Sequence, residues 1–141
     1  MKKYAPVVVR VGIALVVLWF GVEQILHPEM WVFLLPTWTT MLGLSPTVLI
    51  YLNGAFELVV GTALIAGIAT RYTALIIALH LFDIAYTVGY GDVAVRDVGL
   101  ALSAVSIFLN GRDDWSLDTI WLQGKQNMSL VQEQVNTNIQ N

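Results

Sequence analysis

Four long apolar segments limit the folds open to this chain, which is 57% hydrophobic and only 12% charged. Hydropathy places the segments at residues 5–26, 46–69, 72–89 and 93–109. Each is close to the ~20 residues that an α-helix needs to cross a ~30 Å hydrocarbon core. Backbone polar groups must be satisfied internally in lipid, and segments of this length achieve that as helices. The sequence therefore predicts an all-α protein, an up-down bundle of four transmembrane helices.

The basic residues are sorted almost entirely to one side of this predicted bundle. Arg96 falls on one side, and on the other side are Lys2, Lys3, Arg10, Arg71, Arg112 and Lys125. Lys and Arg accumulate in cytoplasmic loops, close to the ends of the spans. Both termini are therefore predicted to be cytoplasmic, and the 27–45 loop to be on the outer side.

Composition divides the chain into three parts. Residues 1–111 form the predicted transmembrane domain, and residues 112–122 are predicted to be an interfacial segment. Residues 123–141 are rich in Asn and Gln and have little apolar surface to bury, which predicts a mobile polar tail. The 27–45 loop is apolar and aromatic but too short to cross the membrane. It is expected either to lie in the interface or to dip back and cap the outer mouth of the bundle.

Two absences narrow the possible chemistry. The chain has no basic patch, so nucleic acid is not an expected partner. It has no cysteine, which excludes disulfides, thiolate metal sites and a dithiol relay within this chain. A redox role would need a bound cofactor, a bound quinone or a partner subunit. No metal site is predicted, because no recognised ligand spacing surrounds His80, the intramembrane histidine.

Polar residues inside the spans gather in the outer half at matched depths. With a rise of ~1.5 Å per residue, Glu57 and His80 lie roughly 14–16 Å below the outer boundary. Asn53 and Asp83 lie roughly 9–10 Å below the same boundary. Asn53 and Glu57 are four residues apart and share a helix face, as His80 and Asp83 do on the next span. The spacing predicts a pocket that opens outward, with Glu57 and His80 at its floor.

The fourth span adds charged residues near the rim of this predicted pocket. Arg96 and Asp97 lie within about 6 Å of the outer boundary. A polar or small stripe is predicted to face the bundle axis, formed by Arg96, Gly99, Ser103, Ser106 and Asn110. Two polar residues on the first span are expected at the membrane edges: Arg10 by snorkelling to the cytoplasmic boundary, and Gln24 by reaching the outer interface.

Two interpretations of these polar residues stay open at this point. Intramembrane ionisable groups usually mark a binding site or proton route. On that interpretation Glu57 and His80 are the candidate catalytic residues, and the candidate substrate-binding residues are Asn53, Asp83, Arg96 and Asp97. A His–carboxylate pair suits quinone reduction, because each carbonyl oxygen needs a hydrogen-bond donor and a proton. On the other interpretation the polar groups pair only to fix helix register.

The order of these residues resembles the DoxX-like family of small four-helix membrane proteins. The resemblance covers about residues 7–118. It rests on Arg10 with Gly21, Gly54-x-x-Glu57-x-x-x-Gly61, Gly67-x-x-Thr70-Arg71, Asp97-x-Gly99, Gly111 and Trp115-Ser116-Leu117-Asp118. It implies a four-helix bundle in a prokaryotic cytoplasmic membrane, in which Glu57, Arg71 and Asp97 matter most. Named members are membrane subunits linked to thiosulfate:quinone oxidoreduction, and others are tied to redox-stress complexes.

We therefore expect a membrane subunit of a quinone-linked oxidoreductase, with quinone as the cofactor and with other subunits or further copies of the chain as partners. Whether the chain is itself an enzyme is left open. The alternative is a non-enzymatic structural subunit or assembly factor of a membrane complex. A small solute or proton conduit is disfavoured, because the inner halves of the spans are nearly uncharged.

Overall fold

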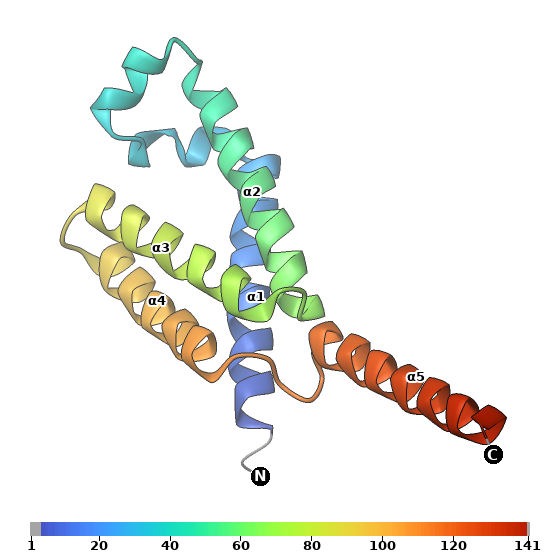
Figure 1. Cartoon of the computed structure of the whole chain (residues 1–141). Coiled ribbons are helices and arrows are strands. Elements are labelled where there is room, and N and C mark those ends of the chain that lie inside the picture. The colour runs from blue at the N-terminus through green and yellow to red at the C-terminus, as the bar shows by residue number, and fades with distance from the viewer. Residues whose placement is uncertain (1–3, 141) are drawn as a thin grey trace.

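The structure is a computed structural model that describes residues 4–140, and within that range it contains helices and turns but no strand (Figure 1). The five α-helices are α1 (Ala5–Leu26), α2 (Pro46–Ala66), α3 (Thr70–Val88), α4 (Asp92–Asn110) and α5 (Leu117–Gln140). Three short 3₁₀ helices occupy the first loop: Pro28–Met30, Val32–Leu34 and Thr37–Leu42. We call the end of the bundle that carries this loop the loop end, and the end where α1 begins and α5 leaves the terminal end (Figure 1).

Three helices, α1, α2 and α3, are long and apolar enough to cross a membrane. The all-helical fold and a membrane location are thereby confirmed. Helix α4 has the length of a span, but Asp92, Arg96 and Asp97 lie in its first two turns. That α4 also crosses, and that the terminal end is cytoplasmic, stay predictions. Lys2 and Lys3, which contribute to the charge asymmetry, lie outside the described residues.

Helices α1 and α2 approach each other closely through glycines. A Cβ atom built at Gly21 would lie 3.0 Å from the Gly54 carbonyl oxygen, and one built at Gly54 would lie 3.0 Å from the Gly21 carbonyl oxygen. A Cβ at Gly61 would lie 2.9 Å from the Leu18 side chain. Small residues that allow such an approach are a main source of helix association in lipid. The glycines of α2 therefore fix the α1–α2 crossing.

Helices α3 and α4 form the second close pair and lie side by side across α1 (Figure 1). Alanines line their buried faces, among them Ala74 and Ala78 on α3 and Ala101 and Ala104 on α4. Together with Ile13, Val17, Leu64 and Ile77 these alanines belong to one core cluster shared by the four helices. The core is thus built from thin side chains that let four backbones pack together.

The predicted inward stripe of α4 was wrong. Gly99 and Ser106 are exposed, and the buried face of α4 carries Ala94, Asp97, Ala101, Ala104 and Ile107 instead. The hydroxyl of Ser103 donates to the Gly99 carbonyl oxygen at 2.9 Å, four residues back. A serine that is satisfied by its own helix can face lipid, so this stripe did not need the bundle axis.

Helix α5 leaves the bundle and projects away from it (Figure 1). It runs through position 123, where the sequence predicted an interfacial segment to give way to a polar tail. From position 123 to position 138 every residue is exposed. This part of α5 packs against nothing in the bundle, which agrees with a mobile segment. Its mobility itself stays a prediction.

Candidate functional site

A polar network centred on Glu57 joins three helices in the loop-end half of the bundle. Glu57 is 3% exposed, and both of its carboxylate oxygens accept hydrogen bonds. Gln24 of α1 donates from Nε2 to Glu57 Oε2 at 3.0 Å. Asn53 donates from Nδ2 to Glu57 Oε1 at 3.0 Å and to Gln24 Oε1 at 2.7 Å. The network satisfies a carboxylate that would be costly to bury alone.

His80 of α3 completes this network. Its Nε2 lies 3.2 Å from Glu57 Oε1, and its ring contacts the Phe56 ring edge-to-face at a centroid distance of 4.9 Å. The predicted proximity of Glu57 and His80 is therefore confirmed. His80 donates from Nε2 when Glu57 is ionised, and it can accept there when Glu57 is protonated. One proton can thus be held by either atom of this contact without movement of a helix.

Helix α4 contributes an ion pair close to the same region. Arg96 donates from Nε to Asp97 Oδ1 at 2.8 Å. Asp97 is buried, whereas the Arg96 side chain is partly exposed and lies over the Phe20 ring of α1 at 4.4 Å. The cation–π contact ties α4 to α1, and the pair keeps Asp97 from being a buried unpaired charge.

These side chains line one cavity of about 270 Å³. Its walls include Glu57, His80 and Arg96, and the 27–45 loop closes it from the loop end with Trp31, Leu34 and Trp38. The loop thus covers the loop end of the bundle, and whether it also lies in the membrane interface stays a prediction. The loop-end wall of the cavity is therefore largely apolar and aromatic.

One polar atom of the cavity wall is unsatisfied. The indole nitrogen Nε1 of Trp31 is buried and has no hydrogen-bond partner among the described residues, although its ring packs edge-to-face on Phe20 at 5.5 Å. An orphan buried donor costs ~1–3 kcal/mol, so it usually finds a partner. Trp31 is one of the residues that line the cavity, and its Nε1 would reach an acceptor on a bound molecule after the indole ring turns toward the cavity.

The structure brings together all six predicted site residues along this cavity: Asn53, Glu57, His80, Asp83, Arg96 and Asp97. Asp83 differs from the others because it is exposed and makes no hydrogen bond or ion pair to a described residue. No three His, Asp or Glu side chains within the described range are placed to hold a metal ion.

Sequence reasoning missed Gln24, which is buried in the Glu57 network and does not reach the interface. Gln24 lies three residues after Gly21, on the face of α1 that meets α2. A Cβ built at Gly54 would lie 3.1 Å from Gln24 Cβ, so the absent side chain of Gly54 makes room for the glutamine. The glycine three residues earlier was the signal that could have placed Gln24 inside.

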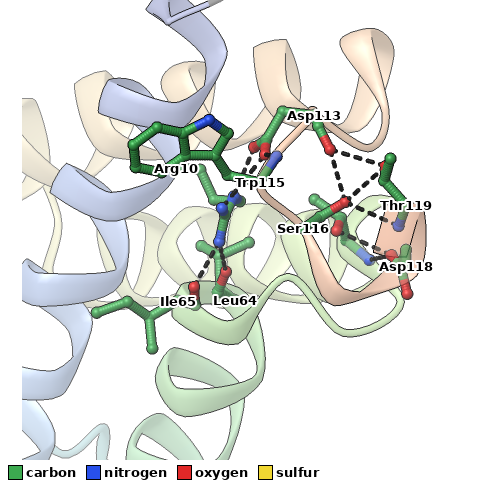
Figure 2. Close-up of polar contacts among 9 residues, drawn as sticks. Arg10, Leu64, Ile65, Asp113, Trp115, Ser116, Asp118 and Thr119 are labelled. Carbon is green, nitrogen blue, oxygen red and sulfur yellow. Dashed lines mark hydrogen bonds and ion pairs between the residues drawn. The ribbon is translucent and has the colours of Figure 1, made fainter. Parts of the chain in front are cut away.

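A second buried network lies at the terminal end and corrects the expectation for Arg10 (Figure 2). Arg10 is 2% exposed and does not snorkel to the boundary. Its Nε donates to Asp113 Oδ2 at 2.6 Å, and its Nη1 donates to the carbonyl oxygens of Leu64 at 2.7 Å and Ile65 at 2.5 Å. The guanidinium therefore holds the end of α2 and the α4–α5 connection together.

The connection is fastened to α3 by Asp118. Its carboxylate accepts from the backbone N–H groups of Ala69 at 2.8 Å and Thr70 at 2.7 Å, and from the Thr70 hydroxyl at 2.9 Å. Burial raises the pKa of Asp118, but these hydrogen bonds and the charge of Arg112 outweigh it, and the pKa lies below the usual 3.8. Asp118 thus caps the N-terminus of α3 from a distant part of the chain.

The connection also fits tightly against the α2–α3 turn. Gly67 has φ +71°, and a Cβ there would lie 2.5 Å from Ser116 Cβ. Only glycine adopts this backbone without strain and leaves the space that Ser116 fills. The Gly67 carbonyl oxygen also accepts from the Asp118 N–H at 3.1 Å. Gly67, Thr70 and Asp118 thus act together to seat the connection on the α2–α3 turn.

Comparison with known proteins gives one match. The family model described as DoxX matches residues 5–89, which span α1, the capping loop, α2 and α3 and include Gln24, Glu57 and His80. No curated protein and no solved structure matches the chain. The matched region is more than half of the 141 residues, and the chain therefore belongs to the DoxX family.

Proposed function

We propose that this protein is the membrane subunit of a quinone-linked oxidoreductase and that the cavity beside Glu57 binds the quinone ring. The observation that carries the proposal is one cavity lined by the His80–Glu57 pair and by Trp31, whose buried indole N–H has no partner among the described residues. The volume of about 270 Å³ is near the lower end of the ~300–1,000 Å³ of small-molecule sites, which suits one ring better than a large ligand.

The residues of the cavity match the needs of a quinone ring. A bound quinone supplies a two-electron acceptor whose two carbonyl oxygens each take up one proton. Trp31 would offer a neutral donor to one oxygen, and the Glu57–His80 pair would supply an exchangeable proton to the other. Leu81 and Ile84 add apolar surface to the cavity lining. Most small-molecule sites combine apolar walls with a few polar groups in this way.

Electron delivery is assigned to a partner in this proposal. The chain has no cysteine and so no dithiol relay of its own. The capping loop presents exposed apolar side chains, including Met30, Phe33, Trp38 and Met41, on the face that a partner at the loop end would meet. The protein would then position the quinone and its protons while another subunit carries the redox centre.

One observation favours the alternative, a structural subunit or assembly factor. Both carboxylate oxygens of Glu57 already have polar partners within the protein, namely Gln24, Asn53 and His80. A closed network of this kind can serve only to fix the register of α1, α2 and α3. On this alternative the cavity would be lined by polar groups but would have no ligand.

Trp31→Phe separates the two functions. The substitution removes a donor that has no partner in the free protein, and it preserves the ring contact with Phe20. We expect an unchanged melting temperature without quinone and about fivefold weaker binding of a short-chain benzoquinone, the loss of one neutral hydrogen bond. Binding is measured by equilibrium titration of the full chain in mild detergent.

The matched control is Trp19→Phe, because Trp19 is exposed, also packs on Phe20 and does not line the cavity. It is expected to leave both quantities unchanged. Absence of quinone binding by the wild type, or equal binding by Trp31→Phe, would favour the structural alternative.

A further inference from the structure

A second cleft lies at the terminal end, away from the Glu57 cavity and outside the proposed quinone chemistry. Its volume is about 580 Å³, and three elements form its walls. Arg71 and Tyr72 come from the start of α3, Arg112 follows the end of α4, and Trp121 and Leu122 come from α5. The cleft therefore exists only because the α4–α5 connection folds back against α3.

The cleft has an excess of positive charge with unused donors. Arg71 donates from Nε to the Phe108 carbonyl oxygen at 3.1 Å, and its other guanidinium nitrogens make no hydrogen bond to a described residue. Arg112 is exposed and makes no hydrogen bond within the described part of the chain. The acidic residue of the lining is Asp118, and both of its oxygens are already engaged by Ala69 and Thr70.

The position of the cleft is that of lipid headgroups. Helices α2 and α3 are candidate spans, and the turn between them, at Gly67, therefore lies at the membrane boundary. Tyr72 is 72% exposed and Trp121 is 62% exposed, beside the arginines. Amphipathic aromatic side chains collect at this depth, where their rings meet acyl chains and their polar atoms meet headgroups.

We propose that this cleft binds the phosphate of an anionic phospholipid from the leaflet at the terminal end, with Arg71 and Arg112 as its ligands. The guanidinium groups offer paired donors that match phosphate oxygens. Basic clefts beside membrane helices recognise anionic headgroups in this way. The exposed rings of Tyr72 and Trp121 lie where the glycerol and acyl parts of the same lipid would continue. These rings favour a lipid over a soluble phosphate.

The binding also has a consequence for α5. Trp121 and Leu122 belong to the first turns of α5, and a lipid in the cleft would contact both α3 and α5. Exposed apolar residues continue along α5 at Met128, Val131 and Val135. An anionic lipid at the root of α5 would thus draw this helix toward the membrane surface.

The test measures lipid retained by the full-length protein in mild detergent, using native mass spectrometry with equal phosphatidylglycerol and phosphatidylcholine. We expect the wild type to retain phosphatidylglycerol at least fivefold over phosphatidylcholine. Arg112→Gln should reduce that retention about fivefold, as expected for one basic residue at an anionic headgroup. Arg112→Lys, which keeps the charge, should retain most of it.

Two controls make the result specific. Lys125→Gln removes one positive charge on α5 near the cleft, where the ammonium lies 3.9 Å from the Trp121 ring, but Lys125 does not line the cleft. It should change retention less than twofold. An unchanged melting temperature for lipid-free Arg112→Gln shows that the fold is intact. Arg71→Gln is the second-choice variant, because Arg71 also holds the end of α4.

Three outcomes would overturn the proposal. Equal retention of the two lipids would remove the headgroup preference. An Arg112→Gln variant that retains phosphatidylglycerol like the wild type would remove the assigned ligand. Displacement of the lipid by equimolar glycerol 3-phosphate would assign the cleft to a soluble phosphoester instead.

Discussion

The two buried polar networks of this protein differ in what they leave open. At the terminal end, Arg10 donates to Asp113 and to two main-chain carbonyl groups (Figure 2). At the loop end, Glu57 accepts from Gln24 and Asn53, contacts Nε2 of His80 and also borders a cavity of about 270 Å³. An unpartnered indole N–H lies in the wall of that cavity, and no such atom lies in the Arg10 network.

This difference shows how a structural charge can be told from a candidate functional one. Both networks bury an ionisable group almost completely, and both link several helices. Burial and pairing alone therefore do not identify a site. Of the two buried networks of the described structure, the one around Glu57 borders a cavity and lies beside an unpartnered buried donor, and the one around Arg10 has no unpartnered buried atom, so the two networks should respond differently to substitution.

The largest expected effect is the loss of Arg10. Arg10→Met leaves the buried Asp113 carboxylate without its cation and frees the carbonyl oxygens of Leu64 and Ile65. Breaking a buried ion pair from one side costs ~3–5 kcal/mol, so unfolding in detergent should require much less denaturant. The double variant Arg10→Met with Asp113→Leu should recover part of this loss, since no unpaired charge remains. A single variant as stable as the wild type would mean that the network contributes little to stability.

The next effect concerns function more than stability. In Glu57→Gln the new amide can still accept from Asn53 and His80, but its nitrogen faces Nε2 of Gln24, so one of the hydrogen bonds is lost. We expect a stability change of ~1 kcal/mol and a loss of quinone-linked turnover of about tenfold or more, because proton exchange is removed.

Turnover is measured in membranes that contain the whole complex, and stability by denaturation of the purified chain. Gln24→Met, which removes the hydrogen bond to Glu57 Oε2 but leaves the contact between Glu57 Oε1 and His80 Nε2 in place, serves as the comparison. Full turnover by Glu57→Gln would place Glu57 with Arg10 as a structural group.

The two networks also differ in how far the sequence predicted them. Depth along each span placed Glu57 beside His80, because both lie inside regular helices of known rise. The same arithmetic could not find the partner of Arg10. Asp113 lies beyond the end of α4, in a connection that folds back into the bundle, and no periodic pattern describes such a path. The rule that arginines near a boundary snorkel was then the wrong choice.

Helix α4 shows a second limit of sequence reasoning. Two stripes of small residues run along it, one containing Gly99 and Ser106 and the other containing Ala101 and Ala104. Both have helical spacing, and polarity favoured the first. The alanines are buried instead. The facing surface of α3 also carries alanines such as Ala74, and small side chains on both helices let the two backbones approach closely. Which of two similar stripes faces inward depends on the neighbour, which the local sequence does not describe.

A smaller effect is expected from Asp118, the acidic cap that fastens the terminal-end connection to α3. Its pKa is lowered in the folded protein, so the stabilisation is complete above the unfolded value of about 3.8 and is lost as the pH falls through the folded value. The melting temperature should therefore drop below about pH 4. Asp118→Asn should be less stable by ~1 kcal/mol at pH 7 and should show a flatter acid profile. Identical acid profiles for the two proteins would mean that the cap does not couple to folding.

The smallest effect is expected from truncation after Gly124, which tests whether the terminal-end network needs the rest of α5. The network ends at Thr119, whose hydroxyl donates to the Asp113 carbonyl oxygen at 2.8 Å, and the cleft ends at Leu122. From position 123 to 138 α5 is exposed along its length, so its removal uncovers no buried surface. The melting temperature in detergent should stay within about 1 °C of the wild type, since little stabilising burial is lost. A large decrease would show that α5 docks on the bundle or on a second copy, and the terminal end would then be an assembly surface as well as a structural closure.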